Sequence, residues 1–355
     1  MFANLNNIRI IDIANKANVS AGTVDRVIHN RGKVSTKTHE IVQKVIDELN
    51  YKPNTIAQAL AMKKERVLYV LIPYILSGEY WEIVNFGIDK AQEELEVYGF
   101  TIKKMFFDQY CVETFNKCTE ELKKTDDFDG IVIAPHFREE TCCFADWLLE
   151  NDIPYVFVDT EINHHNHFAY FGQNSHDCGR VFARLCLELL PPESNILIFN
   201  IHGGRNRKSS QVSVIEDGFC EYLKEVNQEK QVSVLEVCMD EPEINSKIDS
   251  FIKENPQIKV AVVFNSRAYY LAEYLELTNN DRIKILGLDL LKRNVEYLKK
   301  GQIKYLLSQK PETQGYNALK ALSNYFIFKA LPKNKMNYTS IDILIKENVD
   351  YYLMD

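Results

Sequence analysis

Polar side chains that can bind a small polar molecule stand directly after short apolar runs in the chain. Asp159 follows IPYVFV, Asp289 follows ILGL, and Gln309 follows YLLS. Asn265 and Arg267 stand after VAVVF. Carboxylate and amide oxygens accept hydrogen bonds, whereas amide and guanidinium nitrogens donate them. These residue types predict a site that binds a polar ligand by several hydrogen bonds.

Positive charge is concentrated in the N-terminal segment of the chain. The chain has 355 residues and a net charge of -8, but residues 1–66 carry 11 Lys and Arg against 6 Asp and Glu. The other 289 residues carry 31 bases against 44 acids. A small basic segment on a large acidic body is expected when only that segment meets a polyanion.

The residue pattern of the basic segment predicts a helix-turn-helix. From Arg9 the apolar residues recur at the spacing of one helix face, and Asn18 suits the left-handed conformation of a tight turn. Ser20 can cap a second helix that runs to about His29, and Ser35 starts a third helix with its own apolar stripe. The short run TIAQALAM after Pro53 is expected to form a further helix that is too short to be stable alone.

Beyond Val67 short apolar runs alternate with helical patterns. The runs VLYVLIP, FTIKKMFF, GIVIAP and IPYVFVD form one series, and NILIFN, VSVLEVC, VAVVFN and IKILGLD form a second. Such alternation predicts parallel sheets with helices on both faces. Two series predict two doubly wound lobes, whose strand ends meet around a common cleft. The polar residues at the ends of the runs, together with Asn200, are therefore expected to surround that cleft.

A family resemblance is carried by the stretch IRIIDIANKANVSAGTVDRVIHNRGKVSTKTHEIVQKVIDELNYKPNTIAQALAMKK. It resembles the headpiece and hinge of lactose-repressor (LacI-type) regulators over about 55 residues. The resemblance implies sequence-specific binding to a double-stranded DNA operator. The implied DNA-binding residues are Ser20, Ala21, Gly22, Thr23, Arg26, His29, Asn30, Tyr51, Asn54, Ala57 and Leu60. Leu60 matches the residue that wedges into the minor groove and kinks the operator.

The recognition helix departs from the family pattern. Ala21 and Gly22 present almost no side chain, so Arg26 is left with most of the direct readout, through the O6 and N7 atoms of guanine. The alternative for Arg26 is a phosphate contact or a solvated helix face. Asp25 stands where the family usually has Ser near a phosphate, and an acid there disfavours that contact.

The rest of the chain resembles the regulatory domain of the same family and the periplasmic sugar-binding proteins. The motifs are DGIVIAP, IPYVFVD, FGQNSHDCGR, DGF at 217–219, ILGLD and LLSQKPETQGYNAL. The expected architecture is an all-α helix-turn-helix headpiece and hinge helix, followed by an α/β two-lobed periplasmic-binding-protein-like domain. The expected boundaries are 1–53 for the headpiece, 54–66 for the hinge, 67–172 with 301–335 for lobe one, and 173–300 with 336–355 for lobe two.

This second resemblance implies a small-molecule effector, a sugar or sugar derivative. Carried over by position, Tyr80 and Trp81 stack on the ligand. The residues expected to bind its polar groups are Asp159, Asn174, Asn265, Arg267, Asp289 and Gln309. Ile215 replaces the usual ligand-gripping Arg, and Arg267 supplies a cation that would favour an acidic or phosphorylated ligand, such as a sugar acid or sugar phosphate. The alternative for Arg267 is a surface residue at a helix start.

The sequence gives less support to three other functions: a metal site, an enzyme and a transport-type binding protein. His164, His165 and His167 could hold a metal, but no Cys or carboxylate set accompanies them, so a solvated loop is favoured. The chain lacks G-x-S-x-G, a Walker A loop and G-x-G-x-x-G, so neither an enzyme nor a cofactor is expected. A transport-type binding protein would carry a signal peptide and no basic head. We expect a cytoplasmic homodimer without a membrane segment, because one headpiece reads only a half-site.

Overall fold

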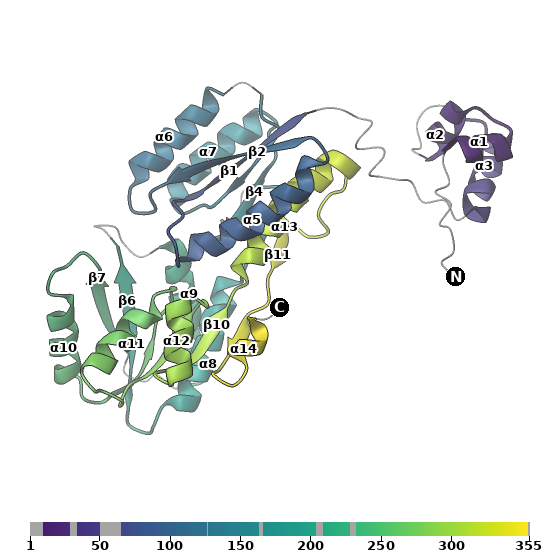
Figure 1. The fold of residues 1–355 in the computed structure, drawn as a ribbon. Coiled ribbons are helices and arrows are strands. Elements are labelled where there is room, and N and C mark those ends of the chain that lie inside the picture. The colour runs from purple at the N-terminus through teal and green to yellow at the C-terminus, as the bar shows by residue number, and fades with distance from the viewer. Residues whose placement is uncertain are drawn as a thin grey trace. The chain divides into compact units, whose positions relative to one another are not determined.

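The computed structural model describes residues 10–28, 34–49, 65–125, 127–162, 166–203, 209–227 and 232–353 (Figure 1). The chain forms two compact units, Met1–Ala61 and Met62–Asp355. None of the helices in the described ranges is long and apolar enough to cross a membrane. Six of the predicted DNA-binding residues lie outside the described ranges: His29, Asn30, Tyr51, Asn54, Ala57 and Leu60.

The first unit contains the predicted helix-turn-helix. Its helices are α1 (Ile10–Ala17), α2 (Ala21–Ile28) and α3 (Thr36–Glu48). Asn18 has a φ of 54°, which confirms the left-handed turn between α1 and α2. The backbone N–H of Thr23 donates to Ser20 Oγ (3.2 Å), and that of Thr38 donates to Ser35 Oγ (3.2 Å). Both predicted helix starts are therefore capped by a serine hydroxyl.

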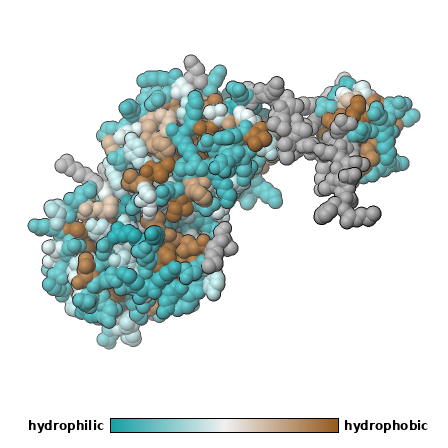
Figure 2. Space-filling view, in the orientation of Figure 1, coloured by the Kyte–Doolittle hydropathy of each residue, from teal (hydrophilic) through white to brown (hydrophobic). Residues whose placement is uncertain are grey.

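The second unit consists of two α/β lobes, each built on a six-stranded sheet. The sheet of lobe one has the order β11-β5-β4-β3-β1-β2, and the sheet of lobe two has the order β12-β10-β9-β8-β6-β7. All the pairings are parallel except that of β12 with β10. The predicted pair of doubly wound parallel sheets is thus confirmed. The face of this unit seen in Figure 2 is mostly hydrophilic, with apolar side chains in scattered patches.

Lobe one buries both faces of its sheet. Its strands are β1 (Arg66–Pro73), β2 (Phe100–Phe107), β3 (Gly130–Ile133), β4 (Tyr155–Asp159), β5 (Ala169–Gly172) and β11 (Met336–Tyr338). One face packs against α5 (Tyr80–Glu96) and α13 (Pro311–Phe328). The other packs against α6 (Val112–Lys123) and α7 (Arg138–Glu150). Burial on both faces explains why the strands read as continuous apolar runs.

Lobe two repeats this layout. Its strands are β6 (Asn195–His202), β7 (Val232–Cys238), β8 (Ile258–Val262), β9 (Lys284–Leu288), β10 (Ile303–Ser308) and β12 (Asp342–Leu344). Helices α8 (Ser175–Leu189) and α9 (Ser210–Glu225) cover one face. Helices α10 (Ile244–Glu254), α11 (Ala268–Leu277) and α12 (Lys292–Lys300) cover the other, and the short α14 (Val349–Tyr352) adds Val349 to that core.

Two of the predicted lobe boundaries are wrong. Strand β10 falls within 301–335, which was assigned to lobe one, but it pairs with β9 and so belongs to lobe two. Strand β11 falls within 336–355, which was assigned to lobe two, but it pairs with β5 in lobe one. Both strands are placed by pairing with distant segments, which local sequence patterns do not reveal.

The chain crosses between the lobes three times. The crossings follow β5, β10 and β11, and hydrogen bonds hold them together. The backbone N–H of Thr339 donates to the carbonyl of Gly172 (2.7 Å), and the Thr339 hydroxyl donates to the carbonyl of Gln309 (2.9 Å). Because the three crossings are tied side by side, a change at one of them must be accommodated by the others.

Helices α8 and α9 cross closely enough to require glycine. A Cβ built on Gly179 would lie 1.9 Å from the carbonyl oxygen of Ile215 and 2.7 Å from the backbone nitrogen of Phe219. We therefore expect Gly179→Ala to lower the free energy of unfolding by about 2 kcal/mol, since overpacking forces the helices apart. Urea unfolding checks this. Lys224→Ala, at an exposed position of α9, is the control, and equal stability of the two variants would contradict the packing argument.

Candidate functional site

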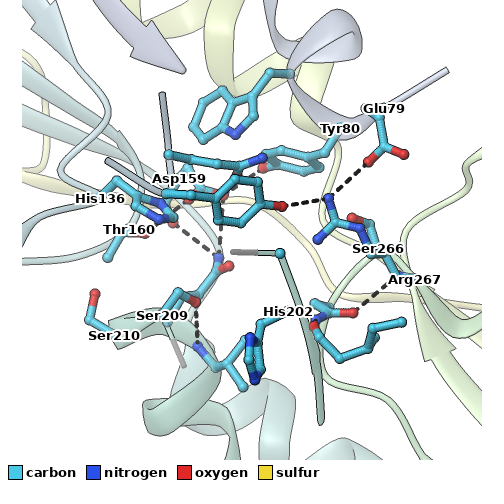
Figure 3. A pocket seen from close by; sticks show the side chains of 18 of the residues that line it. Glu79, Tyr80, His136, Asp159, Thr160, His202, Ser209, Ser210, Ser266 and Arg267 are labelled. Atoms are coloured by element: carbon cyan, nitrogen blue, oxygen red, sulfur yellow. Dashed lines mark hydrogen bonds and ion pairs between the residues drawn. The ribbon is translucent and has the colours of Figure 1, made fainter. Parts of the chain in front are cut away.

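A cavity of about 890 Å³ lies between the two lobes (Figure 3). It is lined by residues that follow the carboxyl ends of strands in both sheets, as the strand-end rule predicts. Seven of the eight predicted effector-binding residues line it: Tyr80, Trp81, Asp159, Asn265, Arg267, Asp289 and Gln309. The structure thus brings together residues that lie up to 229 positions apart in the chain, from Tyr80 to Gln309.

Asn174 is the one predicted residue that lies elsewhere. It is the N-cap of α8, where its side-chain oxygen accepts a hydrogen bond from the backbone N–H of Asp177 (3.1 Å). Its side-chain nitrogen donates to the Asp177 carboxylate (2.7 Å). Both ends of the amide are engaged at the helix start, so its position is explained by capping.

Asp159 is the polar end of β4 and belongs to lobe one. Its backbone is left-handed, with a φ of 72°, so the chain turns sharply at the end of the strand. One carboxylate oxygen accepts from the Tyr80 hydroxyl (2.7 Å) and the other from the Thr160 hydroxyl (2.9 Å). Burial raises the pKa of the carboxyl group above its ordinary value, and these donors partly oppose the rise.

Asp289 occupies the matching position after β9 in lobe two, again with a positive φ, of 66°. Its carboxylate accepts two contacts from the Gln309 amide nitrogen, at 3.0 and 3.3 Å. The Asn294 amide donates to the carbonyls of Leu288 and Asp289 (both 3.0 Å), which holds the turn. Burial raises the pKa of Asp289 to about 8, and the nearby charge of Asp159 adds to the rise.

Gln211 connects the two acidic positions across the lobes. It lies in the first turn of α9, and its amide nitrogen is 3.4 Å from an Asp159 carboxylate oxygen and 3.3 Å from the Gln309 side-chain oxygen. A chain of hydrogen bonds therefore runs from Tyr80 to Asp289. Gln211 follows no apolar strand directly, which is why sequence reasoning missed it.

The two aromatic residues at the start of α5 are buried. Tyr80 is 8% exposed and Trp81 6%, and their rings meet edge to face at 5.2 Å. Because burial raises the pKa of Tyr80 well above its usual range, the hydroxyl keeps its proton and donates a hydrogen bond to Asp159. The stacking role predicted for both rings remains a prediction.

Arg267 joins the lobes at the edge of the cavity. Its Nη2 donates to the Tyr110 hydroxyl (2.9 Å) and lies 3.4 Å from a Glu79 carboxylate oxygen. Figure 3 marks the contact between Arg267 and Glu79 by a dashed line. Tyr110 and Glu79 belong to lobe one, whereas Arg267 precedes α11 in lobe two. Tyr110 also lies against Gly203, where a Cβ would be 2.5 Å from the ring. The charge of Arg267 is thus engaged within the protein.

Several polar atoms of the lining lack a hydrogen-bond partner among the described residues. They are Asn200 Nδ2, His202 Nδ1 and Arg267 Nε. His136 also lines the cavity, and burial lowers its pKa to about 4, so its ring is neutral near pH 7. Buried polar groups without partners carry a free-energy penalty that a bound ligand can relieve.

The described part of the headpiece presents a small, polar helix face. Ala21, Gly22 and Arg26 are exposed on α2, Ser20 is exposed directly before it, and Thr23 is half-buried beside them. Arg26 Nε donates to the carbonyl of Gly22 (3.0 Å), which leaves the terminal nitrogens of the guanidinium group outside that bond. The buried side of the helix carries Val24 and Val27.

The histidine alternative gains no support from the described residues. His167 is buried, and its ring packs on Phe157 at 5.1 Å, while His164 and His165 lie outside the described ranges. No group of three or more His, Cys, Asp or Glu within those ranges is arranged to hold a metal ion.

The raised pKa of Asp289 predicts how stability changes with pH. Between its ordinary value of 3.8 and about 8, the folded protein holds a proton that the unfolded chain releases, so the contribution of this group falls as pH rises. We expect Asp289→Asn to stabilise the ligand-free protein by about 1–4 kcal/mol more at pH 8 than at pH 5. The titratable groups close to Asp289 are Asp159, Tyr80 and Cys178.

Urea unfolding at the two pH values measures this difference. The Glu150→Gln variant, at an exposed position on α7, is the control. A pH dependence that is the same in Asp289→Asn and in the unsubstituted protein would contradict the assignment of the proton to Asp289.

Taken together, the fold and the cavity define a two-lobed ligand-binding domain preceded by a helix-turn-helix unit. The profile described as "Periplasmic binding protein domain" matches residues 69–330, and that described as "Bacterial regulatory proteins, lacI family" matches residues 9–54. The chain belongs to the lacI family of bacterial regulatory proteins.

Individual relatives agree with this assignment. A protein from Bacteroides fragilis assigned as a LacI transcriptional regulator is 33% identical, with a TM-score of 0.77, and the match covers 81% of this chain and 100% of that one. The ribose operon repressor of Halalkalibacterium halodurans is 30% identical over 65% of this chain, but the match spans only 63% of that repressor. The glucose-galactose binding protein GanP from Geobacillus stearothermophilus shares the fold, at 19% identity and a TM-score of 0.67 over 81% of this chain and 99% of that one.

Proposed function

We propose that this protein is a sequence-specific transcription repressor whose affinity for its DNA operator is controlled by a small hydroxylated effector, a sugar or sugar derivative. The observation that carries the proposal is the joining of two sites in one chain. A capped recognition helix exposes Arg26, and a separate two-lobed domain holds a polar cavity. The name of the ribose operon repressor supports the same pairing of a sugar with an operon.

The cavity suits reversible binding rather than catalysis. Its polar groups form a chain of hydrogen bonds from Tyr80 through Asp159, Gln211 and Gln309 to Asp289. Such a set of donors and acceptors fits the hydroxyl groups of a polyol. The relatives named above as regulators support a role without catalysis.

We propose that the cavity is coupled to DNA binding through the three crossings between the lobes. They are hydrogen-bonded to one another, and Gln309, at the start of the second, lines the cavity, so a ligand that changes the angle between the lobes must move all three. A ligand shifts a conformational equilibrium only through its different affinity for the two states. We place the protein in the cytoplasm and expect a homodimer that binds a pseudo-palindromic operator.

Selection from a random DNA pool tests the proposal. The full chain is expected to enrich a pseudo-palindromic sequence, and footprinting should show two protected half-sites about one helical turn apart. Binding should weaken steeply with salt, as phosphate contacts require. Failure to enrich any sequence from the pool would contradict the proposed function.

A further inference from the structure

Three side chains from the two lobes meet at one edge of the cavity. Glu79 and Tyr110 belong to lobe one, and Arg267 belongs to lobe two. The Nη2 atom of Arg267 bonds the Tyr110 hydroxyl (2.9 Å) and lies 3.4 Å from the Glu79 carboxylate. The Arg267 side chain is 13% exposed and that of Glu79 28%, so water and salt screen this ion pair less than a pair on the open surface. The contact therefore stabilises the arrangement in which the lobes touch.

A turn in lobe two holds Arg267 in place. Asn265 stands after β8, and its side-chain oxygen accepts a hydrogen bond from the backbone N–H of Arg267 (3.1 Å). The Asn265 side-chain nitrogen donates to the carbonyl of Ile201 in the neighbouring strand β6 (2.7 Å). The amide thus ties the turn that carries Arg267 to the sheet. Less conformational entropy is then lost when the guanidinium group binds across the lobes.

A turn in lobe one holds Tyr110 in a similar way. The backbone N–H of Tyr110 donates to Asp108 Oδ1 (2.8 Å), and that of Asp108 donates to the hydroxyl of Thr114 in α6 (2.9 Å). The Tyr110 ring lies against Gly203 of lobe two, where a Cβ would be 2.5 Å from Cζ and 2.8 Å from the hydroxyl oxygen. Glycine at position 203 therefore leaves the space that the ring of the opposite lobe occupies.

A second contact between the lobes lies at Gln211. Its amide nitrogen is 3.4 Å from both the carbonyl oxygen and a carboxylate oxygen of Asp159. Hydrogen bonds between nitrogen and oxygen are most often about 2.9–3.0 Å long, and bonds to charged groups contribute more than neutral ones. Of these two contacts, the one at Arg267 includes a shorter bond and a charged donor, so it contributes more to holding the lobes together.

We propose that Glu79, Tyr110 and Arg267 form a latch between the lobes. The latch stabilises the arrangement of the lobes in this structure by contacts of the protein alone, and it must open before the lobes can separate. Its strength therefore sets the balance between the two lobe arrangements on which an effector acts. This regulatory role rests on the proposed function, whereas the latch itself does not.

Hydrogen–deuterium exchange of the full chain tests the latch without DNA or effector. Arg267→Met removes the guanidinium group, and Gly203→Ala displaces the Tyr110 ring while it keeps all three latch residues. The reporter is the backbone amide of Thr160, which lines the cavity in lobe one, is 6% exposed and bonds the carbonyl of Val158 (2.9 Å). Both substitutions lie in lobe two, and each is expected to speed exchange at this amide about tenfold, the effect of losing one hydrogen bond to a charged group.

Two further variants make the exchange experiment decisive. Arg184→Met removes an ion pair with Glu188 within α8 and should leave exchange at Thr160 unchanged. The double variant of Gly203→Ala and Arg267→Met should exchange more slowly than the product of the two single effects predicts, because both substitutions break the same contact. Unchanged exchange in both single variants, or effects that multiply independently, would overturn the latch.

Operator binding in the absence of effector tests the regulatory role. Arg267→Met and Gly203→Ala are expected to change operator affinity in the same direction by about fivefold or more, and Arg184→Met is expected to have no effect. Unchanged affinity, or changes in opposite directions, would overturn the regulatory role. Failure to select any DNA sequence would instead contradict the proposed function and would leave the exchange result as the test of the latch.

Discussion

Arg26→Ala is expected to weaken binding to the selected operator by about ten- to a hundredfold, the range for loss of one bidentate base contact. The physical reason is the sparse surface of α2. Ala21 and Gly22 offer no hydrogen-bonding side chain, and Arg26 is the long exposed side chain of the helix. Fluorescence anisotropy with the selected operator and with a scrambled duplex measures both affinities.

The comparison of the two duplexes decides the role of Arg26. A base contact predicts a large loss on the operator and a small loss on the scrambled DNA. Lys44→Ala is the matched control, because it removes one positive charge from an exposed position of α3. Equal losses on both duplexes would mean that Arg26 contacts phosphates, and that sequence is read through the shape of the operator.

The second large effect concerns the cavity. Asp289→Ala is expected to lower the affinity for the effector by about ten- to a hundredfold, because it removes a buried hydrogen-bonding carboxyl group and leaves the Gln309 amide without its partner. Calorimetric titration with the compound that most stabilises the unsubstituted protein measures this loss. Asp281→Ala, at an exposed position before β9, is the control. Unchanged affinity in Asp289→Ala would place the ligand elsewhere.

Local chemistry made the headpiece predictable. The left-handed turn at Asn18 and the serine caps at Ser20 and Ser35 each depend on residues within three positions, so the sequence pattern contains the necessary information. The alternating runs likewise predicted the two sheets. Strand β10 was misplaced because its six residues look like any buried strand, and its lobe is decided by pairing with β9.

The cavity residues that directly follow a strand could be predicted from the sequence, because ligands bind at the carboxyl ends of parallel strands. Asp159, Asp289 and Gln309 follow apolar strands, and parallel sheets place such ends around one cleft. The chemistry of Arg267 was not predictable, because it depends on Glu79, a residue 188 positions away that the fold brings to 3.4 Å. The contact gives the guanidinium group a carboxylate partner in the other lobe.

Asn174 shows the limit of carrying a residue over by position. The amide suits a ligand-binding role by type, but its location at the start of α8 gives it a capping role that satisfies both of its polar atoms. Capping and ligand binding use the same residue types, and the helix boundary decides between them.

The central claim is that ligand binding in the cavity controls the affinity of the protein for its DNA operator. It is tested most directly by measuring operator affinity of the full chain with and without a saturating concentration of the effector, in the unsubstituted protein and in Asp289→Ala. We predict a change of about tenfold or more in the unsubstituted protein, a typical coupling between two sites, and a much smaller change in the variant at the same concentration. Equal operator affinity with the cavity empty and demonstrably filled would contradict the account.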